Sequence, residues 1–440
     1  MYSEKIEKML KKANIENGDQ IKVEAEGGEF SGLLMPTQEN EKSETLLIKL
    51  NSGYNISLEP NSVELISKGE KRKTREEKGD KSKAGDIVIL GCGGTIASKI
   101  EYKTGAVYPS ISPKELKMAF PELEKYPVHS KSVFSLFSED FNSEHWKIIA
   151  KEIESEIKNG STGIVIMHGT DSMTYTSSAV SYMLQNLPVP VVFVGSQRSS
   201  DRPSSENEMN LTNAVFSATK NFGEVGVCMH ATTNDNYCYI HRGTRVRKMH
   251  TSKREAFKSI NEMPMFKTDY LKNEFVQINP KVKPRSEIKE FKVVGDFNPN
   301  VAMLYAHPNL SPKLLSKMSD YDGIVIVGMG LGHVSTNPFN DPKVQGLGKE
   351  IKELIQSGVS VVMSPQAIYG RICMRVYTTG RMLIDEGVIG DGADWTPEAA
   401  YTKLCWVLSQ TKEPKKVEKM MMENIAGEIS EISAIETIED

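Results

Sequence analysis

The sequence predicts an α/β fold: a mainly parallel, doubly wound sheet in two α/β domains, preceded by a small N-terminal β-barrel domain. Three observations predict it. From residue 86 onward, short β-branched runs alternate with longer amphipathic segments, which is typical of parallel strands covered by helices on both faces. Before residue 67, short alternating runs are separated by turn residues, as in small antiparallel barrels. Between these two regions lies a stretch with almost no apolar residues.

The first 66 residues are predicted to form the small β domain, with a docking role. An amphipathic helix over residues 3–13 precedes five short runs, and a Gly-Gly pair marks the first turn between them. This pattern indicates a closed barrel or a curled sheet. Such barrels also face RNA in some proteins, but the runs do not interleave aromatic and basic residues. The expected strands are 20–25, 30–34, 45–50, 55–58 and 63–66.

Residues 67–85 are predicted to be a solvated linker. Their sequence, SKGEKRKTREEKGDKSKAG, is almost entirely charged or small, so it cannot bury a core. The linker therefore separates the small β domain from everything that follows.

The remainder of the chain is predicted to contain a larger α/β domain over residues 86–280 and a smaller one over 295–412. A polar, proline-bearing bridge at 280–300 joins them. The expected strands are 87–90, 164–168, 190–194, 225–229, 301–305, 323–328 and 359–363, and the expected helices include 143–158, 174–186, 207–220 and 345–357.

The C-terminal tail, residues 413–440, is predicted to be helical. Met420, Met421, Met422 and Ile425 would lie on one apolar face of that helix. Methionine clusters fill irregular gaps in cores and interfaces, so we expect this face to pack against the body or a partner.

Composition excludes several classes of protein. The chain has 440 residues with 39% hydrophobic residues, 25% charged residues and a net charge of −4, which is ordinary for a globular protein and argues against a globally nucleic-acid-binding surface. No apolar run approaches the roughly 20 residues that span a bilayer, and the N-terminus lacks the apolar segment of a signal peptide. Five cysteines without CxxC spacing indicate free thiols in the cytoplasm, and the histidines show no metal-binding spacing, so no bound metal is expected in this chain.

Two glycine-rich loops each follow a predicted strand and each deliver a threonine. The first is Gly91-Cys92-Gly93-Gly94-Thr95-Ile96-Ala97-Ser98, and the second is His168-Gly169-Thr170-Asp171-Ser172. Ligands bind beyond the carboxyl ends of strands in open α/β sheets, so this pair favours an active site. A phosphate-binding turn is the alternative for the first loop, although GxxxxGK[ST] and GxGxxG are absent there. A helix N-cap is the alternative for the second.

GGTIAS and HGTD resemble the two signature motifs of the L-asparaginase/glutaminase type I family, and the resemblance covers about residues 86–412. Further matches are Ser138-Glu139-Asp140, Asn210-Leu211 and the lysine segment Arg247-Lys248-Met249-His250-Thr251. The resemblance implies an asparaginase-like fold and hydrolysis of a side-chain amide, which needs a nucleophile, a base and a site for the oxyanion.

The resemblance implies roles for four catalytic residues. Thr95 would be the first nucleophile, and Thr170, Lys248 and Asp171 would form a coupled second set; attack by Thr170 is the alternative that the sequence leaves open. Lys248 could take a threonine proton if burial makes it neutral, because desolvation disfavours an ammonium ion. Asp171 could orient Lys248 and face a substrate α-ammonium group.

Five further residues are candidates for binding the substrate. Ser138 and Asp140 would hold the amino-acid head group, Gly94 and Gly169 belong to the loops that offer backbone N–H groups, and Tyr108 would lie on a lid over Thr95. His168 is expected to be a packed or capping residue, and Cys92 a small buried filler.

The N-terminal domain extends the resemblance. A small β domain, a charged linker and an asparaginase-like body resemble GatD, the D-type chain of the archaeal glutamyl-tRNA(Gln) amidotransferases. In that family GatD hydrolyses glutamine, and the ammonia passes to a kinase-like partner, GatE, which uses ATP and Mg²⁺ to convert Glu-tRNA(Gln) to Gln-tRNA(Gln). This chain has no recognisable ATP-binding motif, so ATP and Mg²⁺ are expected in the partner. A homodimer within a heterotetramer is expected.

Two other functions fit the sequence. One is a stand-alone cytoplasmic L-asparaginase, and the other is a non-catalytic scaffold that binds tRNA or a partner. The sequence departs from free-standing asparaginases at Gly330-Leu331-Gly332-His333. The later stretch SPQAIYGRICMRVYTT has no clear match to the acidic position of those enzymes. This departure fits a site that another chain completes or regulates.

Overall fold

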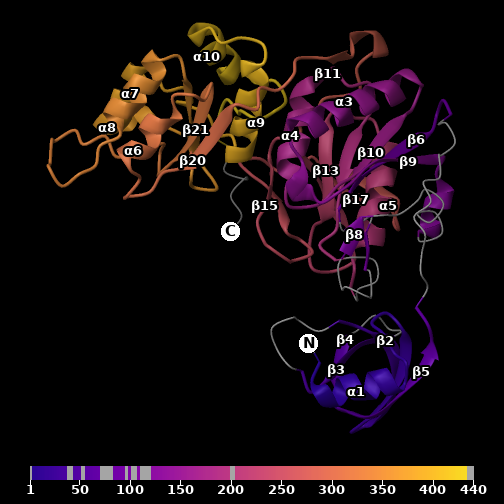
Figure 1. Ribbon diagram of the computed structural model, residues 1–440. Helices are drawn as coiled ribbons and strands as arrows, with labels where there is room; N and C mark the ends of the chain where they lie inside the picture. The colour runs from indigo at the N-terminus through magenta and orange to yellow at the C-terminus, as the bar shows by residue number, and fades with distance from the viewer. Residues whose placement is uncertain are drawn as a thin grey trace.

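The computed structural model describes residues 2–36, 43–50, 55–69, 83–94, 98–100, 107–109, 120–198 and 204–433. At its N-terminus a five-stranded antiparallel sheet has the order β4-β3-β2-β1-β5, and helix α1 (Glu4–Lys12) packs Ile6 and Leu10 into its core (Figure 1). This arrangement confirms the predicted small antiparallel β domain. Its strands are β1 (Gln20–Ala25), β2 (Gly28–Leu34), β3 (Leu46–Leu50), β4 (Asn55–Leu58) and β5 (Pro60–Ser67).

The larger α/β domain is built on an eight-stranded sheet of order β18-β17-β14-β13-β12-β10-β6-β9. The pairs from β13 to β9 are parallel, whereas β13–β14, β14–β17 and β17–β18 are antiparallel. The strands are β6 (Ile87–Gly93), β9 (Val128–Leu136), β10 (Gly163–Met167), β12 (Val191–Val194), β13 (Val225–His230), β14 (Cys238–Arg242), β17 (Phe266–Asp269) and β18 (Glu274–Gln277).

Helices cover both faces of this sheet, as the sequence predicted. Successive strand residues point to opposite faces, so Val88 and Leu90 join one core with α3 and α4, while Ile87 and Ile89 join the other with α5. A capping box starts α3: Asn142 Oδ1 accepts from the N–H of Glu144 at 3.0 Å, and His145 Nδ1 accepts from the N–H of Asn142 at 3.1 Å. The helices are α3 (Ser143–Lys158), α4 (Met173–Met183) and α5 (Asn207–Ala218).

The smaller domain contains a three-stranded parallel sheet of order β20-β21-β22. Helix α9 is almost wholly buried, because it packs on this sheet and on α4 of the larger domain (Figure 1). One continuous core therefore spans both domains. The elements are β20 (Val301–Tyr305), α6 (Pro312–Leu315), β21 (Gly323–Gly328), α7 (Gly348–Gln356), β22 (Ser360–Pro365), α8 (Thr378–Glu386), α9 (Pro397–Leu408) and α10 (Pro414–Met422).

Three short two-stranded ladders complete the described elements. One of them joins the bridge between the domains to the end of α4, because Leu184 pairs with Val293. The bridge is thus part of the packed structure. The ladders are β7 (Ser98–Ile100) with β8 (Val107–Pro109), β11 (Leu184–Gln185) with β19 (Lys292–Val293), and β15 (Val246–Lys248) with β16 (Phe257–Ser259).

The tail differs from its predicted helix. Helix α10 ends at Met422, and residues 423–433 continue without helix. The carboxylate of Glu428 accepts the N–H groups of Ile425 and Ala426, which stabilises a turn in place of a further helical turn. The expected packing is present, since Met421 is fully buried and Met420, Met422 and Ile425 pack against the same core. Within the residues that the structure describes, no helix has the length and apolarity to cross a membrane.

Candidate active site

The two glycine-rich loops meet at the edge where β6 and β10 end. These strands are parallel neighbours, so their carboxyl ends lie side by side. Gly94 has a φ of +82°, and a Cβ placed on it would lie 2.4 Å from Cα of Gly169. Only glycine allows this close approach of the two backbones. The N–H of Gly94 donates to the carbonyl of Leu136 at 3.2 Å, which holds the first loop against β9.

A third segment, the turn after β9, contacts the junction of the two loops. Ser138 is buried in a short 3₁₀ turn after β9, and a Cβ placed on Gly169 would lie 2.6 Å from the Cβ of Ser138. The hydroxyl of Ser172 donates to the carbonyl of Ser138. The structure thus brings together three residues that the sequence predicted as binding residues, namely Gly94, Gly169 and Ser138.

Lys248 reaches the second loop from a different part of the fold. It ends β15, where its partner across the ladder is Phe257 of β16. Its Nζ donates to Thr170 Oγ1 at 2.9 Å and to Asp171 Oδ1 at 2.8 Å. Three of the four predicted catalytic residues therefore form one hydrogen-bonded group.

The members of this group differ in their exposure. Thr170 is 6% exposed, whereas the side chain of Lys248 is 15% exposed and that of Asp171 is 69% exposed. A hydroxyl and an amine are thus held in a largely water-excluded position, where their interaction is stronger than in water. The carboxylate of Asp171 faces outward and remains accessible to a further cation.

His168 plays a structural part in the second loop, as the sequence indicated. Its ring is fully buried beside Phe141 and Phe193, and Nδ1 lies 2.7 Å from the carbonyl of Gly169. Burial lowers the pKa of His168 to about 4, so at neutral pH the ring is neutral and Nδ1–H donates to that carbonyl. The histidine thereby fixes the backbone immediately before Thr170.

The structure describes the other predicted residues to different extents. Thr95 lies outside the described residues. Tyr108 belongs to β8, opposite Lys99, and only its backbone is described. Asp140 is exposed at the end of the 3₁₀ turn that begins with Ser138. Cys92 is fully buried, as expected for a filler.

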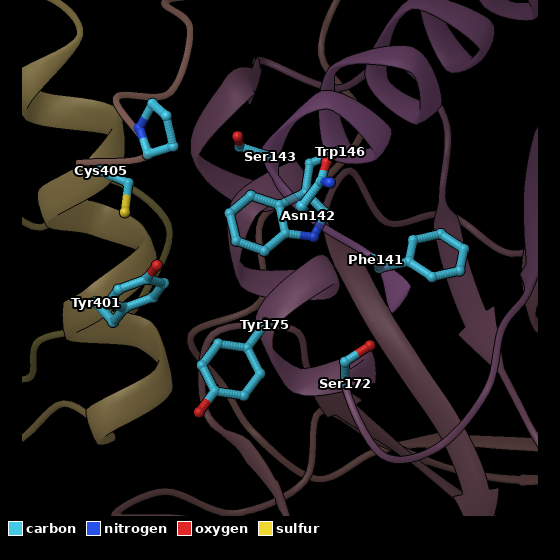
Figure 2. Close-up of a pocket in the computed structure, with 9 residues that line it drawn as sticks. Phe141, Asn142, Ser143, Trp146, Ser172, Tyr175, Tyr401 and Cys405 are labelled. Atoms are coloured by element: carbon cyan, nitrogen blue, oxygen red, sulfur yellow. The ribbon is translucent and has the colours of Figure 1, made fainter. Parts of the chain in front are cut away.

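A cavity of about 400 Å³ adjoins the site at the junction of the two domains. Figure 2 shows Tyr175 and Trp146 of the larger domain facing Tyr401 and Cys405 of α9 across it. The rings of Tyr175 and Tyr401 meet edge to face with 6.1 Å between centroids. Ser172, which contacts the site at Ser138, also lines the cavity.

Sequence reasoning missed the residues that attach β15 to the smaller domain. Arg247 forms an ion pair with Glu398 at 3.0 Å, and Arg245 forms one with Asp394 at 3.1 Å. The pairs join positions about 150 residues apart, and no local pattern identifies such partners. The only local signal is the density of basic residues from Arg242 to Lys253, which does not identify their partners.

Three family models match most of the chain. The model described as "Asparaginase, N-terminal" matches residues 86–281, and "Glutaminase/Asparaginase C-terminal domain" matches residues 300–421. The model described as "GatD N-terminal domain" matches residues 15–67.

Similar proteins and structures agree with these matches. The chain is 42% identical to the glutamyl-tRNA(Gln) amidotransferase D subunit of Pyrococcus furiosus, over 97% of this chain and 98% of that one. It is also 42% identical to the Methanobrevibacter smithii protein of the same name, over 99% and 98%. The thermostable L-asparaginase from Thermococcus kodakarensis has a TM-score of 0.70 and 32% identity, covering 78% of this chain and 99% of its own. L-asparaginase I from Vibrio cholerae has a TM-score of 0.68 and 29% identity, covering 79% and 100%.

Proposed function

The chain belongs to the family of glutamyl-tRNA(Gln) amidotransferase D subunits, and from this premise we propose that it hydrolyses glutamine and supplies the ammonia to a partner protein. The partner then converts Glu-tRNA(Gln) to Gln-tRNA(Gln). The observation that carries the proposal is the contact of Lys248 Nζ with both Thr170 Oγ1 and Asp171 Oδ1. It supplies a hydroxyl, a base within hydrogen-bonding distance and a carboxylate that orients the base.

The reaction divides into two half-reactions. In the first, the Oγ of a threonine forms a bond to the side-chain carbonyl carbon of glutamine while its proton passes to a base, and the C–N bond breaks as ammonia departs with a proton. In the second, water attacks the resulting ester and releases glutamate. Across the 2.9 Å contact with Thr170, Lys248 serves as the base that takes up the hydroxyl proton. By family resemblance Thr95 attacks first, and Thr170 with Lys248 and Asp171 serves as the coupled second set.

The substrate is bound by the residues around this group. The exposed carboxylate of Asp171 meets the α-ammonium of glutamine, and Asp140 and Ser138 hold the rest of the head group. The close contact between Gly94 and Gly169 leaves no side chain between these two residues, so a small amide can approach Thr170. By family resemblance, Tyr108 also contributes to substrate binding.

The partner carries out the remaining chemistry. We place ATP and Mg²⁺ in a kinase-like partner of the GatE type, which also binds Glu-tRNA(Gln), and we propose a homodimer of this chain within a cytoplasmic heterotetramer. The division of labour is supported by the absence of an ATP-binding motif in the sequence.

The N-terminal domain favours this function over a stand-alone L-asparaginase. The match includes 99% and 100% of the two solved asparaginases. It includes only 78% and 79% of this chain. The GatD N-terminal domain model matches residues 15–67. A non-catalytic scaffold is disfavoured, because a protein that only binds tRNA or a partner does not require a lysine hydrogen-bonded to a buried threonine.

Substrate preference tests the proposal directly. The purified full-length chain is assayed for ammonia release from glutamine and from asparagine, with and without its partner protein and Glu-tRNA(Gln). We expect glutamine hydrolysis that rises when the partner and the tRNA are present. Fast hydrolysis of free asparagine, unchanged by either addition, would establish the stand-alone asparaginase, and inactivity under all conditions would establish the scaffold.

A further inference from the structure

The short strand that bears Lys248 contacts the two domains with opposite sides. Side chains alternate between faces along a strand, so within β15 Arg247 points away from Val246 and Lys248, and Arg245 lies in the turn immediately before the strand. Lys248 reaches Thr170 and Asp171 of the larger domain. Arg245 and Arg247 instead reach the smaller domain, where they pair with Asp394 and Glu398.

Arg245 is fully buried at the entrance to β15. Its Nη1 donates to the carbonyl of Asp394 at 2.8 Å and its Nη2 to Oδ1 of the same residue at 3.1 Å. Its Nε donates to the carbonyl of Gly427 at 2.7 Å, and Nη2 also donates to Ser430 Oγ at 2.7 Å. The planar guanidinium is thus held on three sides, by the smaller domain and by the C-terminal tail.

Arg247 provides the second attachment, two residues further along. Its Nε lies 3.0 Å from Glu398 in the first turn of α9, and its Nη2 donates to the hydroxyl of Tyr305 at the end of β20 at 3.3 Å. Glu398 is 8% exposed and the Arg247 side chain is 22% exposed, so this ion pair is partly shielded from solvent. Both attachments closely precede Lys248, because Arg247 lies in β15 and Arg245 in the turn that leads into it.

The tail segment 423–430, which we call the C-terminal strap, holds this arrangement from outside. Thr244 Oγ1 donates to the carbonyl of Ala426 at 2.9 Å. Lys403 of α9 and Glu428 of the strap form an ion pair of 2.5 Å in which both side chains are fully buried. The strap therefore ties α9 of the smaller domain to the segment that leads into β15.

We propose that Arg245 and Arg247 are positioning residues for Lys248, and that the smaller domain and the C-terminal strap set the distance of Lys248 from Thr170 through them. This inference rests on the proposed function, because it assigns the lysine a part in glutamine hydrolysis. A displacement of about 1 Å at a reacting group can reduce a rate by roughly two orders of magnitude. A small shift of β15 therefore changes turnover before it changes the fold.

Replacement of Ser430 tests the proposal with a minimal change. Ser430→Ala removes the hydroxyl that accepts from Arg245 Nη2 but keeps the backbone bond from the N–H of Ser430 to Asp394 Oδ1. We expect kcat for glutamine in the full complex to fall about 10-fold while KM changes less than about twofold, since the binding residues are untouched. Ser430→Thr keeps a hydroxyl and restores kcat.

Ser409→Ala is the matched control. Ser409 is half-buried at the end of α9 and donates to the carbonyls of Asp296 and Trp406, neither of which belongs to β15. Ser409→Ala should lower the midpoint temperature of thermal unfolding about as much as Ser430→Ala does. It should leave kcat unchanged. Glu398→Gln is the second variant; it weakens the attachment of Arg247 and should also lower kcat at nearly constant KM.

The possible outcomes distinguish the positioning role from an effect of general stability and from failure of the proposed function. If Ser430→Ala and Glu398→Gln retain the wild-type kcat, or if Ser430→Thr fails to restore it, the positioning role is wrong. If Ser409→Ala lowers kcat equally, the effect is one of general stability, and the positioning role is again wrong. If the wild-type complex itself does not hydrolyse glutamine, the proposed function fails, irrespective of the variants.

Discussion

Lys248 and Thr170 are 78 positions apart in the sequence, yet Nζ of the first lies 2.9 Å from Oγ1 of the second. The contact joins two independent elements, the end of β15 and the loop between β10 and α4. An amine and a hydroxyl in this relationship can exchange a proton without rearrangement of the chain. The adjoining carboxylate of Asp171 keeps the amine in place.

Lys248→Met should abolish most of the glutaminase activity. The methionine preserves the apolar length of the side chain but cannot accept a proton, so we expect a loss on the order of 10²- to 10⁴-fold in kcat with the fold retained. Glutamate release and circular dichroism measure the two effects. Lys253→Met is the control, because Lys253 is exposed and its ion pair with Glu255 is long, at 3.9 Å. Near-normal turnover in Lys248→Met would remove the lysine from the mechanism.

Gly94→Ala should disrupt the contact between the two glycine-rich loops. A Cβ at this position would lie 2.4 Å from Cα of Gly169, in addition to the strain of a φ of +82°. Gly358→Ala is the matched control, since Gly358 has a φ of +100° but nothing within 4 Å of the added carbon. We expect the control to lose about 1 kcal/mol in the free energy of unfolding, from backbone strain alone. Gly94→Ala should lose more and should also lose activity, as urea denaturation and the glutaminase assay would measure. Equal effects would mean that the loops do not touch.

His168 should make the folded state less stable in acid. Its pKa is lowered by burial to about 4, whereas in the unfolded chain it has the usual value near 6.5. Between these values the unfolded state binds a proton that the native state does not, so the free energy of unfolding falls as the pH falls from about 6.5 to about 4. Below about 4 both states are protonated and this contribution ends.

His168→Gln removes this titration and should flatten the pH dependence. The difference from wild type between pH 6.5 and 4 should reach at most about 3 kcal/mol, because each pKa unit corresponds to roughly 1.4 kcal/mol. Buried His241, whose pKa is lowered to about 3, is present in both proteins and contributes equally to each. Denaturant titrations at several pH values measure the slope. Identical slopes in the two proteins would contradict the assignment.

Lys403→Met should be strongly destabilising. It leaves the carboxylate of Glu428 buried without its counter-ion, which typically costs about 3–5 kcal/mol. Adding Glu428→Gln should recover part of the loss. Lys416→Met breaks the exposed pair with Glu413 and should cost about 1 kcal/mol or less. If Lys403→Met and Lys416→Met have the same thermal midpoint, the strap does not hold the domains together.

Much of the fold could be predicted from the sequence because the central strands are fully buried and read as continuous apolar runs. Ile164-Val165-Ile166-Met167 and Ile324-Val325-Ile326-Val327 lie within β10 and β21. Strands β9, β14, β17 and β18 were missed, because polar residues interrupt the apolar ones in each of them, and β9 and β18 also form the two edges of the sheet. Residues 423–433 were predicted as helix, but the buried carboxylate of Glu428 binds backbone N–H groups there.

The site could be predicted in part for a similar reason. Thr170, Asp171 and Gly94 follow strands directly, so their place at the sheet edge was implied by the strands themselves. Lys248 was identified only through a family motif, since its surroundings are rich in basic residues. Arg245 and Arg247 were not identified at all, because their partners come from a different domain.

The source of nitrogen tests the central claim most directly. The complete amidotransferase, with its partner protein, Glu-tRNA(Gln) and ATP, is supplied with either glutamine or an ammonium salt. With Lys248→Met in this chain, we predict that formation of Gln-tRNA(Gln) from glutamine is lost, while formation from ammonium continues at the wild-type rate. Gln-tRNA(Gln) formed from glutamine at the wild-type rate by the variant would contradict the claim that this chain liberates the ammonia through Lys248.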